Sequence, residues 1–109
     1  MPESLDLLQG TLDVLILKAL AWGAQHGYGV ARWIRETSSE TILVEDRALY
    51  VALHRLEESG WVESEWGVSE NNRRAKYYRL TPAGRRALRS KTADFTAYAN
   101  AVFKVLRTS

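Results

Sequence analysis

The feature that most constrains the fold lies in residues 45–80, where the spacing of apolar side chains changes from helical to strand-like at Gly60. Before Gly60, four apolar residues recur at steps of three and four, so they share one side of a helix. These residues are Leu49, Ala52, Leu53 and Leu56. Asp46 is a suitable N-cap and Gly60 a suitable C-terminal stop, which predicts a short helix of roughly three to four turns.

The opposite side of this predicted helix is largely polar and cationic. It carries Arg47, Tyr50, Val51, His54 and Arg55. A helix with an apolar seam behind and such a face in front is suited to lie in the groove of a duplex while other helices cover its seam. The alternative is an ordinary solvated face, and the helix alone does not decide between the two.

After Gly60, residues 61–66 and again residues 75–80 alternate with a period of two, which predicts two strands. The polar, Asn-rich segment 67–74 between them is typical of a hairpin tip. The nucleic-acid contacts expected from this hairpin are Asn71, Asn72, Arg73, Arg74 and Lys76. A helix followed by a hairpin with a cationic tip is the layout of a winged helix, in which the helix enters the major groove and the hairpin touches the flanking backbone or minor groove.

The charge of the chain is segregated, although the net charge is only +2. Residues 1–66 hold five Lys/Arg against eleven Asp/Glu, whereas residues 67–109 hold ten against two. Such segregation is typical of a surface that binds a polyanion by neutralising phosphates. A solvated charge run is the usual alternative, but the position of the cations at a hairpin tip beside a basic helix face favours DNA contact.

The remaining segments complete a winged helix-turn-helix. Residues 4–22 predict an amphipathic helix, either continuous or broken near Gly10 with Thr11 as a second cap. Residues 24–29 predict a turn or a very short strand that joins the hairpin. Residues 30–37 predict the second helix. We therefore expect a mainly α fold with a small β-hairpin, in which residues 1–81 form the DNA-binding domain.

Residues 82–109 are expected to form a long C-terminal dimerisation helix, capped by Thr81 with Pro82 in its first turn. Its apolar residues recur at coiled-coil-like steps and would leave a large exposed patch on a single copy. The predicted dimer interface comprises Leu5, Leu8, Leu88, Phe95, Tyr98, Ala99, Val102, Phe103 and Leu106. The alternative is packing within one domain. A twofold homodimer would instead place two recognition helices about one DNA turn apart and select an inverted repeat in double-stranded DNA.

The sequence offers little for catalysis, a metal or a cofactor, and we expect none of these. It has two histidines and no cysteine, and no serine lies in a nucleophile elbow, so a hydrolase is disfavoured. His26 is expected to be a turn residue bonded to backbone. The longest apolar run, residues 14–17, is far too short for a bilayer, so a cytoplasmic protein without membrane contact is expected.

Four tryptophans are expected mainly in core or hairpin packing. The sharper alternative is an aromatic slot for a flat effector. Its residues would be Phe95 and Tyr98 of the terminal helix together with Trp22, Trp33 or Trp66, and because the C-terminal part is short, such a pocket is expected between subunits.

Several segments together resemble the PadR family of transcriptional regulators over about residues 5–90. They are residues 8–20 (LQGTLDVLILKAL), 26–29 (HGYG), 48–50 (ALY), 52–57 (ALHRLE), 60–61 (GW) and 71–84 (NNRRAKYYRLTPAG). The resemblance implies a homodimeric transcription factor, usually a repressor, that leaves its operator on binding a small hydrophobic or aromatic compound. It also implies that Tyr50 is a phosphate or groove contact.

Two residues of the recognition helix depart from the family pattern, with Arg47 in place of a glycine and Val51 in place of a proline. Val51 restores a backbone N–H and Arg47 adds a cation, so the operator sequence cannot be transferred from the family. The alternative function is a protein-interaction module that keeps the winged fold without specific DNA binding and uses its long helix to dock a partner.

Overall fold

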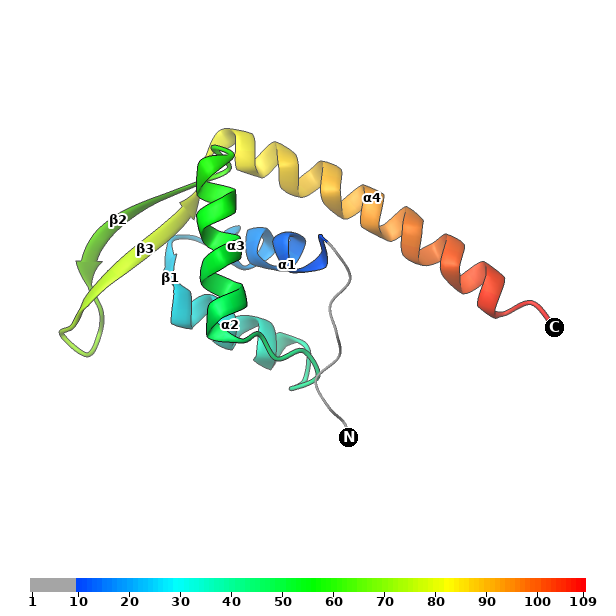
Figure 1. Cartoon of the computed structure of the whole chain (residues 1–109), viewed down its shortest axis with the longest axis horizontal. Helices are drawn as coiled ribbons and strands as arrows, with labels where there is room; N and C mark the ends of the chain where they lie inside the picture. The colour runs from blue at the N-terminus through cyan, green and yellow to red at the C-terminus, as the bar shows by residue number, and fades with distance from the viewer. Residues whose placement is uncertain (1–9) are drawn as a thin grey trace.

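The computed structural model describes residues 10–109, which form four helices and a three-stranded antiparallel sheet (Figure 1). The elements are α1 (Thr11–Leu20), β1 (Gln25–His26), α2 (Gly27–Thr37), α3 (Asp46–Glu58), β2 (Val62–Val68), β3 (Arg74–Leu80) and α4 (Pro82–Leu106). This order confirms the predicted winged helix-turn-helix with a long C-terminal helix. The expectations for Leu5 and Leu8 fall outside the described residues.

The core lies between α1, α2, α3 and the base of the hairpin. Its fully buried side chains are Ile16, Leu17, Leu20, Val30, Leu49, Leu53, Leu56 and Val62. The apolar seam predicted for α3 is therefore confirmed, because all four of its residues are buried. Trp33 is only partly buried and packs at the edge of this core.

The ends of α3 are set by Glu45 and Gly60. Glu45 is the N-cap and makes no side-chain cap bond, so the expectation that Asp46 caps the helix is wrong by one residue. Gly60 has a φ of 79°, and the N–H of Trp61 donates to the carbonyl of Leu56 at 3.1 Å. The predicted stop at Gly60 is confirmed, since a left-handed residue after a helix is best filled by glycine.

Helix α2 begins at Gly27, three residues earlier than predicted. His26 is its N-cap, and Nδ1 of His26 accepts the N–H of Gly29 at 2.9 Å. The backbone hydrogen bond expected for His26 is thus present, but it starts a helix instead of closing a turn. In α1 the cap is Gly10, with a φ of 86°, whereas the hydroxyl of Thr11 makes no hydrogen bond to a described residue, so the capping role expected for Thr11 is wrong.

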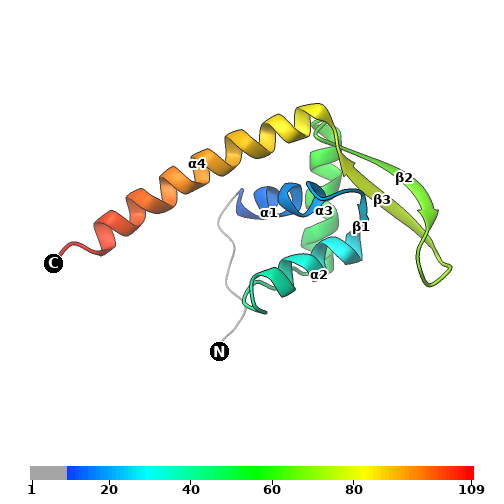
Figure 2. The same cartoon turned by 180° about the vertical axis from the view of Figure 1, so that it is seen from behind.

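The sheet has the order β1-β3-β2, so the short strand does join the hairpin as predicted. Val62 pairs with Leu80 at the buried base, and Val68 pairs with Arg74 near the tip. The tip closes through hydrogen bonds between Ser69 and Arg73 and a left-handed Asn72 with φ 59°. The hairpin extends well beyond the helices (Figures 1 and 2).

Helix α4 starts on the core and then leaves it. Thr81 Oγ1 accepts the N–H of Gly84 at 3.0 Å and donates to the carbonyl of Gly60 at 2.7 Å, which confirms the predicted cap. Ala87 and Leu88 pack against the core, whereas the C-terminal half projects away from the other helices (Figures 1 and 2). The radius of gyration, 15.1 Å, exceeds the ~13 Å of a compact domain of this length for that reason. No helix among residues 10–109 is long and apolar enough to span a membrane.

Candidate nucleic-acid interface

The outer face of α3 is open to solvent along its length. Arg47, Tyr50, Val51 and His54 are all exposed, as the helical spacing predicted. Arg47 forms no ion pair with any described residue, while His54 lies 3.4 Å from Glu58, one turn further along the helix. The N-terminal half of this face thus presents a guanidinium with its donors available.

Arg55 differs from the other residues of this face, because its guanidinium donates to the carboxylate of Asp13 on α1. Asp13 is mostly buried, so the pair joins α3 to α1 at the surface of the core. Arg55 was predicted to contact DNA on helical spacing alone, and the spacing gave no sign of this partner. In the structure, the Arg55 guanidinium forms an ion pair that links α3 to α1.

Tyr50 connects α3 to the first turn of α2. Its ring lies so close to Gly27 that a Cβ added there would come within 2.6 Å of the Tyr50 hydroxyl oxygen. Glycine at position 27 therefore leaves room for the Tyr50 ring against α2, although about half of the Tyr50 side chain stays exposed. Tyr50 is held in place at the junction of the two helices.

The cations of the hairpin divide into a paired and an open group. Lys76 lies 3.8 Å from Glu57 of α3, and Arg79 donates to Glu63 and Glu65 at 3.0 and 2.9 Å. The hydrogen bond with Glu63, together with the two carboxylate charges, raises the pKa of Arg79. Arg73 and Arg74 form no ion pair with any described residue.

The tip of the hairpin faces the N-terminal ends of α2 and α3 across a groove of about 710 Å³. Its cations are Arg32, Arg73, Arg74 and Lys76, with Glu70 as its one carboxylate among the described residues. Its aromatic rings include Tyr28, Tyr50, Trp66 and Tyr78. A concave surface with this excess of positive charge attracts polyanions.

Tyr28 and Arg32 of α2 are among the groove residues that were not predicted. They lie four apart on the outer face of α2, and the Arg32 guanidinium sits 5.7 Å from the centre of the Tyr28 ring. The signal was present in their spacing, but it was missed because the helix was expected to begin at Val30. Asn71, Arg73, Arg74 and Lys76 do line the groove, whereas Arg47, Val51, His54 and Arg55 lie outside its walls.

Burial affects one further groove residue, Tyr78 of β3. Its side chain is almost fully covered at the inner end of the groove. Burial raises the pKa of the Tyr78 hydroxyl, and nearby Tyr50 and Glu57 raise it further. The hydroxyl of this groove residue therefore holds its proton more firmly than that of an exposed tyrosine.

Residues 16–90 match the Transcriptional regulator PadR-like family. The chain belongs to this family. A PadR family transcriptional regulator from Eggerthella lenta is 33% identical, with 93% of this chain and 86% of that chain aligned at a TM-score of 0.76. A transcriptional regulator from Clostridium thermocellum is 31% identical, with 88% and 93% aligned at a TM-score of 0.80. An uncharacterised protein of Lysinibacillus sphaericus is 28% identical over 80 residues, 73% of each chain.

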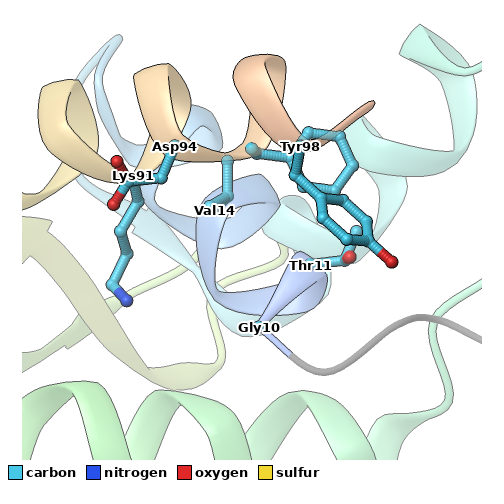
Figure 3. Close-up of a pocket in the computed structure, with 7 residues that line it drawn as sticks. Gly10, Thr11, Val14, Lys91, Asp94 and Tyr98 are labelled. Atoms are coloured by element: carbon cyan, nitrogen blue, oxygen red, sulfur yellow. The ribbon is translucent and has the colours of Figure 1, made fainter. Parts of the chain in front are cut away.

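This PadR-like regulator has a second cavity, of about 430 Å³, between the start of α1 and the middle of α4 (Figure 3). It is lined by Gly10, Thr11, Val14, Lys91, Asp94, Phe95 and Tyr98. The hydroxyl oxygen of Thr11 is buried here and has no hydrogen-bond partner among residues 10–109. Figure 3 shows Tyr98 and Thr11 at one end of the cavity, with Lys91 and Asp94 at the other.

The five residues expected in an aromatic slot do not meet within one copy of the regulator. Phe95 and Tyr98 line the α1–α4 cavity, but none of the three tryptophans does. Trp66 is on the hairpin, and Trp22 is exposed with Lys18 5.3 Å from its ring. Trp33 packs on the core, since it lies on the inner side of α2.

The C-terminal half of α4 leaves an apolar surface uncovered in the single PadR-like chain. Its exposed residues are Phe95, Tyr98, Val102, Phe103, Val105 and Leu106, and Leu106 is 71% exposed. Leu88 was predicted in the same seam, but it packs on this chain's own core. Within residues 10–109 no group of three or more histidine or carboxylate side chains is arranged to hold a metal ion.

Proposed function

We propose that this PadR-like regulator is a homodimeric, sequence-specific DNA-binding repressor. Helix α3 would enter the major groove with Arg47, Val51 and His54. The hairpin would follow the flanking backbone or minor groove with Asn71, Asn72, Arg73 and Arg74. Arg55 instead forms the ion pair with Asp13, and Lys76 lines the groove.

The observation that carries this proposal is the convergence of open cations from three elements on one concave surface. Arg32 of α2, Arg74 of β3 and Arg73 of the hairpin tip line the same groove as Tyr50, which belongs to α3. Phosphate neutralisation by arginine supplies most of the affinity of such proteins for a duplex, and a planar guanidinium donates to phosphate oxygens in pairs. The segregated charge of the sequence supports the same conclusion.

The uncovered face of α4 supports the homodimer. Six large apolar side chains in one helical stripe would be costly to leave in water, and an identical stripe on a second copy matches it by symmetry. Two copies joined along α4 would present two α3 helices to one duplex. In this arrangement residues 10–81 carry the DNA surface and residues 82–109 the interface.

The cavity between α1 and α4 is the proposed effector site. Its volume of about 430 Å³ lies within the usual range for small-molecule sites, and its wall combines the rings of Phe95 and Tyr98 with the charged side chains of Lys91 and Asp94. A small aromatic compound with one polar group would stack on the rings and direct that group toward Lys91 or Asp94. Because the cavity adjoins the proposed interface, its occupant would alter how the two subunits pack and so release DNA.

Selection of bound fragments from random duplexes at physiological salt tests the function. We expect an inverted repeat whose half-site centres are about one helical turn apart. A single asymmetric site would contradict the symmetric dimer. Weak binding that is blind to sequence would contradict the regulator proposed here and favour the interaction module instead.

A further inference from the structure

Trp66 occupies a position at which core packing does not require a large aromatic residue. It lies in the middle of β2, is 57% exposed and is not part of the buried core. It shares a face of the hairpin with Val62, which is buried at the base, but toward the tip this face borders the open groove and Trp66 stays exposed. Something other than burial therefore accounts for an indole here.

The guanidinium of Arg74 stacks on this indole. Val68 pairs with Arg74 and Trp66 with Lys76, so Arg74 is the diagonal neighbour of Trp66 on the same face. The central carbon of the guanidinium lies 4.4 Å from the centre of the Trp66 ring system, and Arg74 has no ion pair among the described residues. A stacked guanidinium keeps its N–H donors free at its edge.

We propose that Trp66 is a positioning residue of the DNA-binding surface, whose indole holds the Arg74 guanidinium ready for a backbone phosphate of the duplex. This role rests on the DNA binding proposed above. Fixing a long arginine side chain costs conformational entropy when a complex forms, and a stack that fixes it in the free protein removes that cost. Both side chains line the groove opposite Tyr50 and Arg32, where such a phosphate would pass.

The stack itself is testable in the free protein, without DNA. In NMR spectra the side-chain N–H signal of Arg74 should be shifted upfield by the indole ring current. Trp66→Ala should return it to the position of a free arginine, Trp66→Phe should keep part of the shift, and Val68→Ala should leave it unchanged. An unshifted Arg74 signal in the wild type would overturn the proposal.

Its consequence for binding is measured with a synthetic duplex of random sequence at low salt. Trp66→Ala should weaken binding by roughly two- to fivefold, as expected for an exposed cation–π contact. The salt dependence and the melting temperature should stay the same, because the Arg74 charge and the fold remain. Trp66→Phe should recover most of the lost affinity.

A double-mutant cycle separates positioning from direct contact. In an Arg74→Ala background, Trp66→Ala should cause no further loss, because the group that it positions is gone. If the two substitutions instead reduce the affinity independently, so that their fold-losses multiply, the indole itself contacts DNA. The positioning role would then be abandoned. If the wild-type protein does not bind the duplex, the proposed function is contradicted. The NMR ring-current shift would still show whether Arg74 stacks on Trp66.

Discussion

Gly84 sets how closely α4 can approach the hairpin. A Cβ built at Gly84 would lie 1.9 Å from the carbonyl oxygen of Trp61, which is backbone and cannot move aside cheaply. Gly84→Ala should therefore destabilise the fold by about 1–3 kcal/mol, as overpacking does elsewhere, although alanine favours a helix. Urea unfolding measures the change. Ser90→Ala, at an exposed position of the same helix, should stay within about 0.5 kcal/mol of wild type.

Tyr78 makes the stability depend on alkaline pH. Its folded pKa is raised above the ordinary value of 10.0, so the folded state holds the phenol proton more firmly than the unfolded chain does. The stabilisation is complete below pH about 10 and is lost as the pH rises through the folded pKa. Thermal unfolding between pH about 9 and about 11 should show a smaller loss in Tyr78→Phe than in wild type. Tyr28→Phe, which removes a hydroxyl from an exposed ring outside the proposed dimer interface, should follow wild type.

Single residues show where sequence reasoning reaches its limit. The exposure of Arg47, Tyr50 and His54 followed from helical spacing, because the period of a helix fixes which side each residue takes. The pairing of Arg55 with Asp13 joins residues 42 positions apart, and no local pattern carries such information. Trp66 was expected in packing or in an effector site, because the sequence pattern did not reveal its contact with Arg74.

Among the elements, the hairpin should supply binding that does not depend on sequence. Arg73→Ala with Arg74→Ala should weaken binding to every duplex and lower the slope of log affinity against log salt by about two units. Arg79→Ala, with Arg85→Ala, is the matched control, because it removes the same charge from positions outside the groove. The two double variants are compared by titration at several salt concentrations. Equal losses would mean that net charge, and not the hairpin tip, determines affinity.

Helix α3 should supply the sequence preference. Arg47→Ala should cost about 1–3 kcal/mol on the selected operator and relax the preference at one base position per half-site, if Arg47 donates to a guanine. Binding to the operator and to single-base variants of it provides the measurement. An equal loss on all of these duplexes would assign Arg47 to a phosphate instead.

The elements themselves were largely predictable, and the errors lie at their ends. The switch of period at Gly60 located α3 and β2, and Thr81 with Pro82 located the start of α4. Helix α2 was expected three residues late because its cap, His26, is not one of the residue types that usually begin a helix. That shift concealed Tyr28 and Arg32, which therefore entered the candidate site only from the structure.

At the scale of the whole molecule, the sequence predicted a long terminal helix but not where it leaves the core. Leu88 and Phe95 belong to one apolar stripe, yet Leu88 packs within the chain and Phe95 marks the start of the uncovered part. Periodicity cannot locate this change, because it depends on how far the remaining core extends beneath the helix. The groove could not be predicted either, since it forms only when the hairpin tip comes to face α2 and α3.

The uncovered stripe provides the test of assembly. Val102 lies within it and is 36% exposed in the single chain, so a charge there would be buried if two copies pair along α4. Val102→Asp should shift the protein from dimer to monomer in sedimentation at micromolar concentration, while its circular dichroism stays that of a folded chain. Affinity for a full inverted repeat should then fall toward that for a single half-site, because two linked half-sites gain from their joint effective concentration.

Ala97→Asp is the control for this substitution, because it adds the same charge to an exposed position on the opposite side of α4. It should leave both the dimer and its affinity for the inverted repeat unchanged. If Val102→Asp and Ala97→Asp behave alike, the stripe does not join two subunits. The two half-sites would then have to be brought together by contacts outside the C-terminal half of α4.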